Sequence, residues 1–83
     1  MLSLKIVSPE KIEYQGEVES VKMPGTLGNF EVLDNHAPII SSLQRGVVEY
    51  IDKEGRHELP VTGGFAEVLK NQVSLCVEKD ANE

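Results

Sequence analysis

The stretch that decides the fold is GTLGNFEVLDNHAPIISSL, which runs from Gly25 to Leu43. Two glycines bracket a short turn at its start, and Phe30 and Val32 then share one face of an alternating segment. An Asp-Asn-His-Ala-Pro corner follows, and a second extended segment covers Pro38–Leu43. Alternation with a period of two is typical of a β-strand with one buried face. The stretch therefore predicts a turn and two short strands joined by a corner.

The amino-terminal segment continues this pattern. A first strand is predicted over residues 2–6, where the alternating apolar residues are Leu2, Leu4 and Ile6. The following Ser-Pro-Glu ends it, because proline cannot donate to a strand ladder. A second strand is expected over Ile12–Tyr14, ending near Gly16. A third covers Val18–Met23, and its apolar phase slips by one residue, which predicts a β-bulge.

The carboxy-terminal half predicts two hairpins. An Asp-Lys-Glu-Gly loop separates the first pair of alternating segments, and Lys70-Asn71 separates the second pair. A Gly63-Gly64 pair is expected to interrupt the chain between the hairpins. The predicted strands are 47–51, 57–61, 65–69 and 73–77.

These segments predict an all-β domain. About eight to ten short, mainly antiparallel strands, with turn signals every 8–12 residues and no convincing helix, favour a sandwich or a barrel. We expect the domain to cover residues 1–78 and a polar tail to cover residues 79–83. Several strands carry apolar residues in both phases, for example Val47 and Ile51 against Val48 and Tyr50. A second buried surface, made on a partner, would explain this pattern.

Composition excludes several classes of function. The chain has 83 residues, with 14 acidic and 8 basic side chains, for a net charge of −6. This charge opposes binding to nucleic acid and direct binding to anionic lipid. No apolar run approaches the roughly 20 residues of a membrane span, and no signal peptide is evident, so the chain is expected to be soluble and intracellular. A single cysteine, Cys76, favours a reducing compartment.

The corner contains a tempting pair, Asp34 and His36, but the sequence predicts no catalytic site. A cysteine nucleophile needs a base within hydrogen-bond reach, and the strand phase places Cys76 beside polar residues with nothing to bring it to His36. His36 is expected to bond the corner backbone or to lie at a partner surface. Asp34 and Asn35 are common turn residues.

Cofactor and metal sites are not predicted either. The four glycines of the two glycine pairs are followed by strands, whereas a phosphate loop opens a helix. The acidic residues of segment 10–19 match no calcium loop, and no Cys/His cluster suggests zinc.

One rival interpretation is a free-standing β-sandwich module that binds a ligand or a protein. Carbohydrate-binding sites of this kind usually offer exposed aromatic rings. The chain has four Phe and Tyr residues, and the strand phase predicts that Phe30 and Phe65 are buried.

Three segments, in their order along the chain, resemble the epsilon subunit of bacterial F-type ATP synthase. They are VSPEK (7–11), PGTLGNFEVLDNHAPIISSL (24–43) and VTGGFAEVLKNQVSL (61–75). The resemblance implies a flattened β-sandwich of about ten strands at the foot of the rotating central stalk. It implies a non-catalytic subunit without a cofactor, peripheral at the cytoplasmic face of the bacterial plasma membrane and not inserted in it.

The resemblance also implies partners. The gamma subunit and the membrane c-ring would bind directly, and the alpha/beta catalytic hexamer indirectly, so that proton transport is coupled to ATP synthesis. The residues implied to face the c-ring are Gly25, Thr26, Leu27, Gly28, Asn29, Asn35, His36, Ala37 and Pro38. Those implied to approach gamma are Ser8, Ile40 and Ser41.

Two departures from the family pattern accompany the resemblance. Many relatives carry an acid where this chain has Thr26. Typical members also continue into a two-helix carboxy-terminal domain that can inhibit ATP hydrolysis, whereas this sequence ends at Glu83. The sequence therefore leads us to expect that this self-inhibitory arm is absent.

Overall fold

The computed structural model describes residues 1–80, which form eight strands and no helix. This agrees with the predicted all-β class and with the expected number of strands. In chain order they are β1 (Leu2–Val7), β2 (Ile12–Val18), β3 (Ser20–Gly25), β4 (Gly28–Val32), β5 (Ile39–Leu43), β6 (Gly46–Asp52), β7 (Gly55–Leu69) and β8 (Gln72–Lys79).

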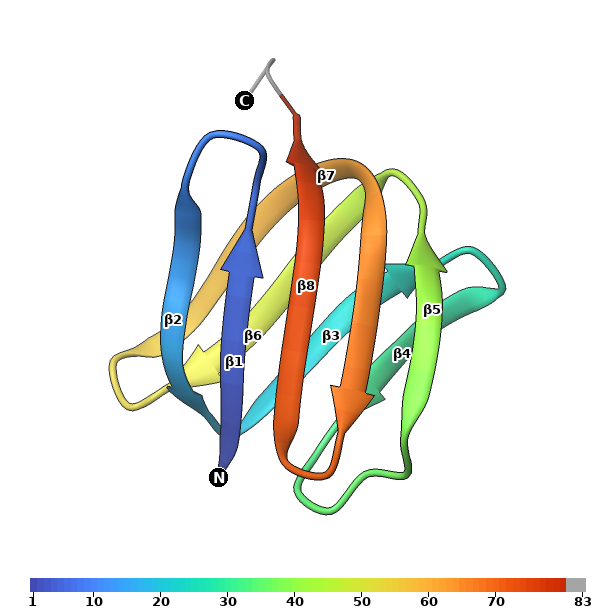
Figure 1. Cartoon of the computed structure of the whole chain (residues 1–83). Helices are drawn as coiled ribbons and strands as arrows, with labels where there is room; N and C mark the ends of the chain where they lie inside the picture. The colour runs from blue at the N-terminus through green and yellow to red at the C-terminus, as the bar shows by residue number, and fades with distance from the viewer. Residues whose placement is uncertain (81–83) are drawn as a thin grey trace.

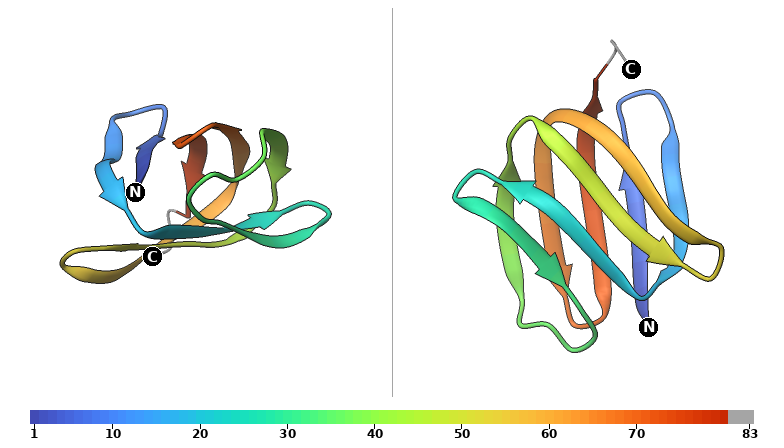
Figure 2. Two further views of the ribbon diagram at one scale, coloured as in Figure 1. Left: turned by 90° about the horizontal axis from the view of Figure 1, so that it is seen from below. Right: turned by 180° about the vertical axis from the view of Figure 1, so that it is seen from behind.

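The strands lie in two facing layers (Figures 1 and 2). One layer contains β1, β2, β5, β8 and the second half of β7, and the other contains β3, β4, β6 and the first half of β7. Among the described residues every ladder is antiparallel except that of β1 with β8. The principal extents of 33 × 29 × 19 Å give the flattened sandwich that the resemblance implied.

Alternating side chains of both layers fill the core between them. Leu2, Leu4 and Ile6 are fully buried on β1, as their spacing predicts, and Val73 and Leu75 are 1% exposed on β8. Burying a side chain of this size stabilises the fold by about 1.5–3 kcal/mol. The period-two pattern is thus the main sequence signal for the core.

The predicted interruption at Gly63-Gly64 is wrong, because β7 runs through 15 residues without a break. Its ladder with β8 shifts register between Val61 and Gly63, and Gly64 has a φ of 148°. A Cβ atom at Gly64 would overlap the carbonyl oxygen of Cys76. The glycine pair therefore lets one strand bend from the layer that contains β6 into the layer that contains β5 and β8.

The predicted bulge in 18–23 is also wrong. β2 ends at Val18 and β3 begins at Ser20, and the ladders of β3 with β4 and β6 have regular registers. The chain changes layers at Glu19 (Figure 1). Because the new layer faces the core from the other side, the inward phase resets there, and this produces the slip.

The prediction that Phe65 is buried is wrong as well. Its side chain is 64% exposed, whereas Ala66 and Val68 are each 1% exposed. These two neighbours take the inward positions of β7 and force Phe65 outward. Phe30 is partly buried against the core.

The carboxy-terminal end of β8 reaches Lys79, so this residue of the predicted tail belongs to a strand. Residues 81–83 of that tail lie outside the described residues. Among residues 1–80 there is no helix long and apolar enough to cross a membrane.

Candidate docking surfaces

The glycine turn between β3 and β4 is a tight two-residue loop. Gly25 and Gly28 face each other across the ladder, so Thr26 and Leu27 form the tip. Gly28 has a φ of 131°, which favours glycine, and a Cβ at Gly25 would lie 2.7 Å from the Gly28 carbonyl oxygen. A side chain fits at neither glycine without strain, and Leu27 at the tip is 103% exposed.

Hydrogen bonds to the end of β5 hold this turn in place. The Thr26 amide donates to the Ser42 carbonyl oxygen at 3.0 Å, and the two hydroxyls lie 2.7 Å apart. The Gln44 amide donates to the Pro24 carbonyl oxygen at 2.8 Å. The turn is therefore fastened to β4 on one side and to β5 on the other.

The His-Ala-Pro corner lies at the opposite end of β5. His36 Nδ1 donates to the Ala37 carbonyl oxygen at 2.7 Å, so the histidine bonds the corner backbone, which is one of the two roles expected for it. Asn35 has a φ of 62°, and its amide donates to Asn71 Oδ1 at 2.7 Å. Asp34 pairs with the amino-terminal ammonium of Met1 at 3.1 Å. Asp34 and His36 thus have different partners and do not form a catalytic dyad.

The two segments implied to face the ring do not meet. Thr26 contacts the last residues of β5, whereas Pro38 immediately precedes its first residue, Ile39. Five strand residues, about 16 Å at 3.3 Å each, separate them. They share the margin of the sandwich formed by β4 and β5 (Figure 1).

The two β5 residues implied to approach gamma, Ile40 and Ser41, differ in exposure because successive strand residues point to opposite faces. Ile40 points outward and is 76% exposed, whereas its neighbour Ser41 is half-buried and donates to the Ser42 carbonyl oxygen. Ile40 lies opposite Glu67 on β7, whose flanking outward residues are Phe65 and Leu69. These two are 64% and 53% exposed. Ile40, Phe65 and Leu69 are therefore exposed apolar residues on one outer face, with the charged Glu67 opposite Ile40.

Ser8 lies at the far margin of the same layer. With Phe65 and Cys76 it lines a groove of about 540 Å³. Its hydroxyl donates to Glu13 Oε2 at 2.8 Å and accepts from the amides of Glu10 and Lys11 at 3.3 Å each. Through these hydrogen bonds the hydroxyl stabilises the turn between β1 and β2.

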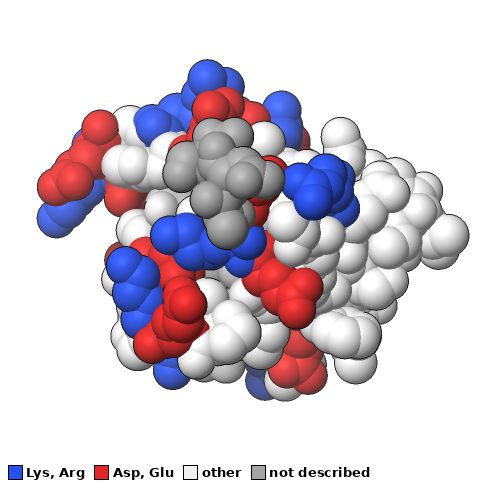
Figure 3. Space-filling model, turned by 90° about the horizontal axis from the view of Figure 1, so that it is seen from above, with Lys and Arg blue, Asp and Glu red and all other residues white. Residues whose placement is uncertain are grey.

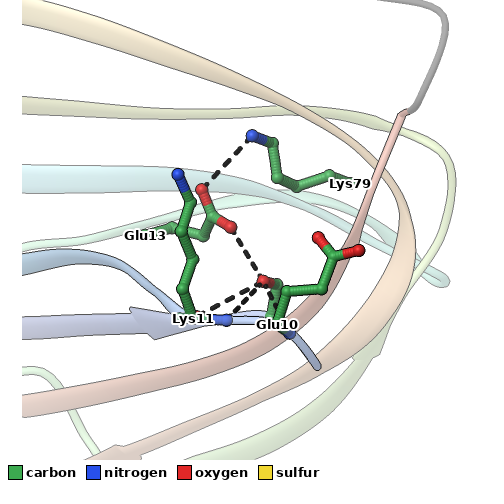
Figure 4. A network of polar contacts seen from close by, with 5 residues as sticks. Glu10, Lys11, Glu13 and Lys79 are labelled. Carbon is green, nitrogen blue, oxygen red and sulfur yellow. Dashed lines mark hydrogen bonds and ion pairs between the residues drawn. The ribbon is translucent and has the colours of Figure 1, made fainter.

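This turn belongs to a polar network, shown in Figure 4. The Glu13 side chain is 6% exposed, and its Oε1 lies 3.4 Å from Lys79 Nζ at the end of β8. The hydrogen bond from Ser8, and then Lys79, hold the pKa of Glu13 below its usual value against the opposing effect of burial. A charged carboxylate thus ties the first hairpin to the last strand.

Sequence reasoning missed a second polar cluster, which joins the two layers. Asp52 accepts hydrogen bonds from the Tyr14 hydroxyl at 3.0 Å and from His57 Nε2 at 2.9 Å. The Tyr50 ring contacts the Tyr14 ring, which is tilted by 46° at a centroid distance of 4.4 Å, and stacks on the His57 ring at 5.2 Å. Burial and the Asp52 bond raise the pKa of Tyr14 to about 12, and the His57 bond lowers the pKa of Asp52. The only local signal was Asp52 in a predicted hairpin loop.

Cys76 is exposed, as its strand phase predicted. It lies five residues along β8 from Asn71, which contacts the corner, so about 16 Å of strand separates it from His36. Among residues 1–80 no group of three or more His, Cys, Asp or Glu side chains is arranged to hold a metal ion.

The two facing layers define the class of the protein, which is a small, flattened β-sandwich domain. The family described as the ATP synthase delta/epsilon chain, beta-sandwich domain, matches residues 1–81. The chain therefore belongs to this family. The resemblance noted from the three sequence segments is confirmed.

Relatives and solved structures agree with this assignment. The ATP synthase epsilon chain of Leptospira borgpetersenii is 44% identical over 80 residues, which are 96% of this chain and 63% of the relative. That of Desulfosudis oleivorans is 44% identical over 78 residues, 93% of this chain and 59% of the relative. This chain thus spans less than two thirds of the length of these relatives.

The solved structures share the fold. A chain of the Euglena gracilis mitochondrial ATP synthase, in a structure of OSCP, F1 and c-ring, has a TM-score of 0.85 at 22% identity. The match covers 92% of this chain and 49% of that one. A chain of the Tetrahymena thermophila central stalk and c-ring has a TM-score of 0.79 at 13% identity, covering 94% and 63%.

Proposed function

We propose that this chain is the β-sandwich part of a non-catalytic rotor subunit in an F-type, proton-translocating ATP synthase. In this role it links the gamma subunit to the membrane c-ring and couples ion transport to ATP synthesis. The family match over residues 1–81 is the observation that carries the proposal. The alpha/beta hexamer would be reached through gamma, and the subunit would lie peripherally at the cytoplasmic face of the membrane.

The gamma subunit is proposed to cover the outer face of the β5–β7–β8 layer. Ile40, Phe65 and Leu69 are exposed there, although a lone domain gains nothing from leaving such groups in water. Ser8 would mark the far margin of this contact, and Ser41 would support the strand beneath it. Apolar area of this kind supplies most of the free energy of a stable interface.

The c-ring is proposed to contact the margin formed by β4 and β5. The glycine turn, Gly25–Asn29, and the corner, Asn35–Pro38, lie at the two ends of this margin. The glycine turn is held by hydrogen bonds to Ser42 and Gln44 at the end of β5, and the corner by one to Asn71 in the turn between β7 and β8. Segments fixed in this way bind a partner with little loss of conformational entropy.

Substitution of Ile40 tests the gamma contact. Ile40→Asp should weaken binding to purified gamma by about tenfold or more, because a buried charge replaces an apolar anchor. The same substitution should leave the melting temperature nearly unchanged, since the side chain is already exposed. Affinity is measured by titration calorimetry and folding by circular dichroism.

Val47→Asp is the matched control, because Val47 is 45% exposed on β6 in the opposite layer. It should bind gamma as the unchanged chain does. Equal affinity of Ile40→Asp and Val47→Asp would remove Ile40 from the contact. If the unchanged chain fails to bind gamma at all, a free-standing binding module becomes the better description.

A further inference from the structure

The end of β8 is tied to the rest of the sandwich by polar contacts at successive residues. The Glu78 carbonyl oxygen accepts a hydrogen bond from the Thr62 hydroxyl on β7 at 3.3 Å. The next residue, Lys79, forms the ion pair with Glu13 on β2 that Figure 4 shows. We call residues 78–80 the strap.

Asp80, at the end of the strap, contacts the β5–β6 turn and β7. Its Oδ2 accepts a hydrogen bond from Arg45 Nη1 at 2.8 Å, which is also an ion pair. Its amide donates to the Pro60 carbonyl oxygen at 3.2 Å. The Asp80 side chain is 17% exposed and that of Arg45 is 67% exposed. The guanidinium therefore reaches from the β5–β6 turn, through water-accessible space, to the end of β8.

The two ion pairs of the strap lie at one end of the sandwich. The β1–β2 turn, the bend of β7, the end of β8 and the β5–β6 turn are all found there (Figure 1). Figure 3 looks onto this end and shows acidic and basic side chains next to one another. The strap borders a groove of about 680 Å³, whose other walls are residues 8–10 and the β7 residues Leu59, Pro60 and Thr62. Detachment of the strap would widen this groove.

The order of charges allows the strap only one register. The strap carries a cation followed by an anion, Lys79 and Asp80, whereas the sandwich offers the anion Glu13 and the cation Arg45. Acidic residues flank Lys79 on both sides, so a shift of one residue in either direction would bring an acid, Glu78 or Asp80, toward Glu13. The Glu13 side chain is only 6% exposed, and leaving its charge without a cation there is unfavourable.

We propose that the strap is a salt-sensitive closure of this groove, which the Arg45–Asp80 pair holds shut and which opens while the rest of β8 stays paired. An ion pair with one exposed partner is weak and is screened by salt. The adjoining part of β8 is held differently, because Leu75 and Val77 are buried in the core at 1% and 3% exposure. Local opening of the strap therefore costs less free energy than opening of the strand.

The experiment is a charge-reversal cycle on the chain itself, because the closure needs no partner. The unchanged protein, Arg45→Asp, Asp80→Arg and the double variant with both changes are compared. Amide hydrogen exchange along β8 is measured by NMR at low and high sodium chloride, with each rate corrected for its intrinsic value. Arg56→Asp is the matched control, since Arg56 is 60% exposed and pairs with Glu49 at 2.9 Å, away from the strap. Circular dichroism checks that each variant folds.

Each single reversal at the strap should speed exchange of the residue 80 amide about three- to tenfold, because it removes one ion pair and adds a repulsion of similar size. The Leu75 amide should be unaffected. The double variant should recover slow exchange, Arg56→Asp should not change it, and salt should speed it in the unchanged protein. Failure of the double variant to recover, an equal acceleration at Leu75, or no effect of salt would each overturn the closure.

Discussion

The β3–β4 turn and the β1–β2 turn are held in place by different kinds of contact. The first is shaped by glycines, by backbone hydrogen bonds to β5 and by the Phe30 ring, with no charged group. The second is closed by the Ser8 hydroxyl and by the nearly buried Glu13 carboxylate, which also pairs with Lys79. Steric fit and backbone hydrogen bonds hold the β3–β4 turn, whereas a charged carboxylate holds the β1–β2 turn.

This difference indicates how each end should respond to its surroundings. Backbone bonds and steric fit are insensitive to pH and salt, so the β3–β4 turn should keep one geometry under all conditions in which the domain folds. A carboxylate network depends on ionisation, so the β1–β2 hairpin should loosen first in acid. The uncharged turn is the better platform for a constant contact.

Gly25→Ala should have the largest effect and tests the steric half of the comparison. The new methyl group would lie 2.7 Å from the Gly28 carbonyl oxygen and 2.8 Å from a Phe30 ring carbon. We expect a loss of about 2 kcal/mol in the free energy of unfolding, as overpacking usually costs. Urea denaturation measures it.

Gly16→Ala on β2 is the control for this substitution. Its nearest neighbour is the Tyr14 hydroxyl at 3.0 Å, a side-chain atom that lies farther away than the 2.7 Å backbone oxygen at Gly25. It should cost clearly less than Gly25→Ala. Equal losses at the two glycines would mean that the β3–β4 turn is no more rigid than β2.

Tyr14→Phe should have an intermediate effect, about 1 kcal/mol, because it removes one hydrogen bond to Asp52 and keeps the ring contact with Tyr50. Burial raises the pKa of Tyr14 to about 12 from 10.0. A raised folded-state pKa gives stability that is present below pH 10 and lost as the pH rises through about 12. The stability difference between the two proteins should therefore shrink in alkali. A difference that stays constant to the highest pH would contradict the bond.

Glu13→Gln should have the smallest effect at neutral pH, because glutamine still accepts from Ser8 and Lys79 is 42% exposed to water. The pKa of Glu13 is lowered from 4.5, so the stability due to its charge is present above pH 4.5 and lost as the pH falls below it. Melting temperatures of the two proteins should converge in acid. Parallel curves over the whole range would mean that the carboxylate contributes nothing as an ion.

The strands could be predicted from the sequence because burial on one face leaves a local period of two, as in Leu2, Leu4 and Ile6. Their arrangement in layers could not. The phase slip after Val18 resembles a bulge locally, and only the position of the partner strands distinguishes it from a change of layer. Gly63-Gly64 likewise signals irregular backbone without saying whether a strand ends or bends.

The contacts at the candidate surfaces were predictable only in part. Local chemistry offered a bond to the corner backbone as one of two roles for His36, and this bond is present. The contact of Tyr14 with Asp52 joins residues 38 positions apart and leaves no local pattern. The exposure of Phe65 was missed because a large aromatic ring suggests a buried position. The smaller Ala66 and Val68 occupy the inward positions instead.

The parallel pairing of β1 with β8 has a mechanical consequence. The ladder joins five residue pairs, from Ser3 with Gln72 to Val7 with Cys76. Leu2 begins β1 at one end of the ladder and Lys79 ends β8 at the other (Figure 1). Tension applied between these two positions acts along the strands and loads all hydrogen bonds of the ladder together, in shear. An antiparallel pair pulled from neighbouring ends would instead lose its hydrogen bonds one after another.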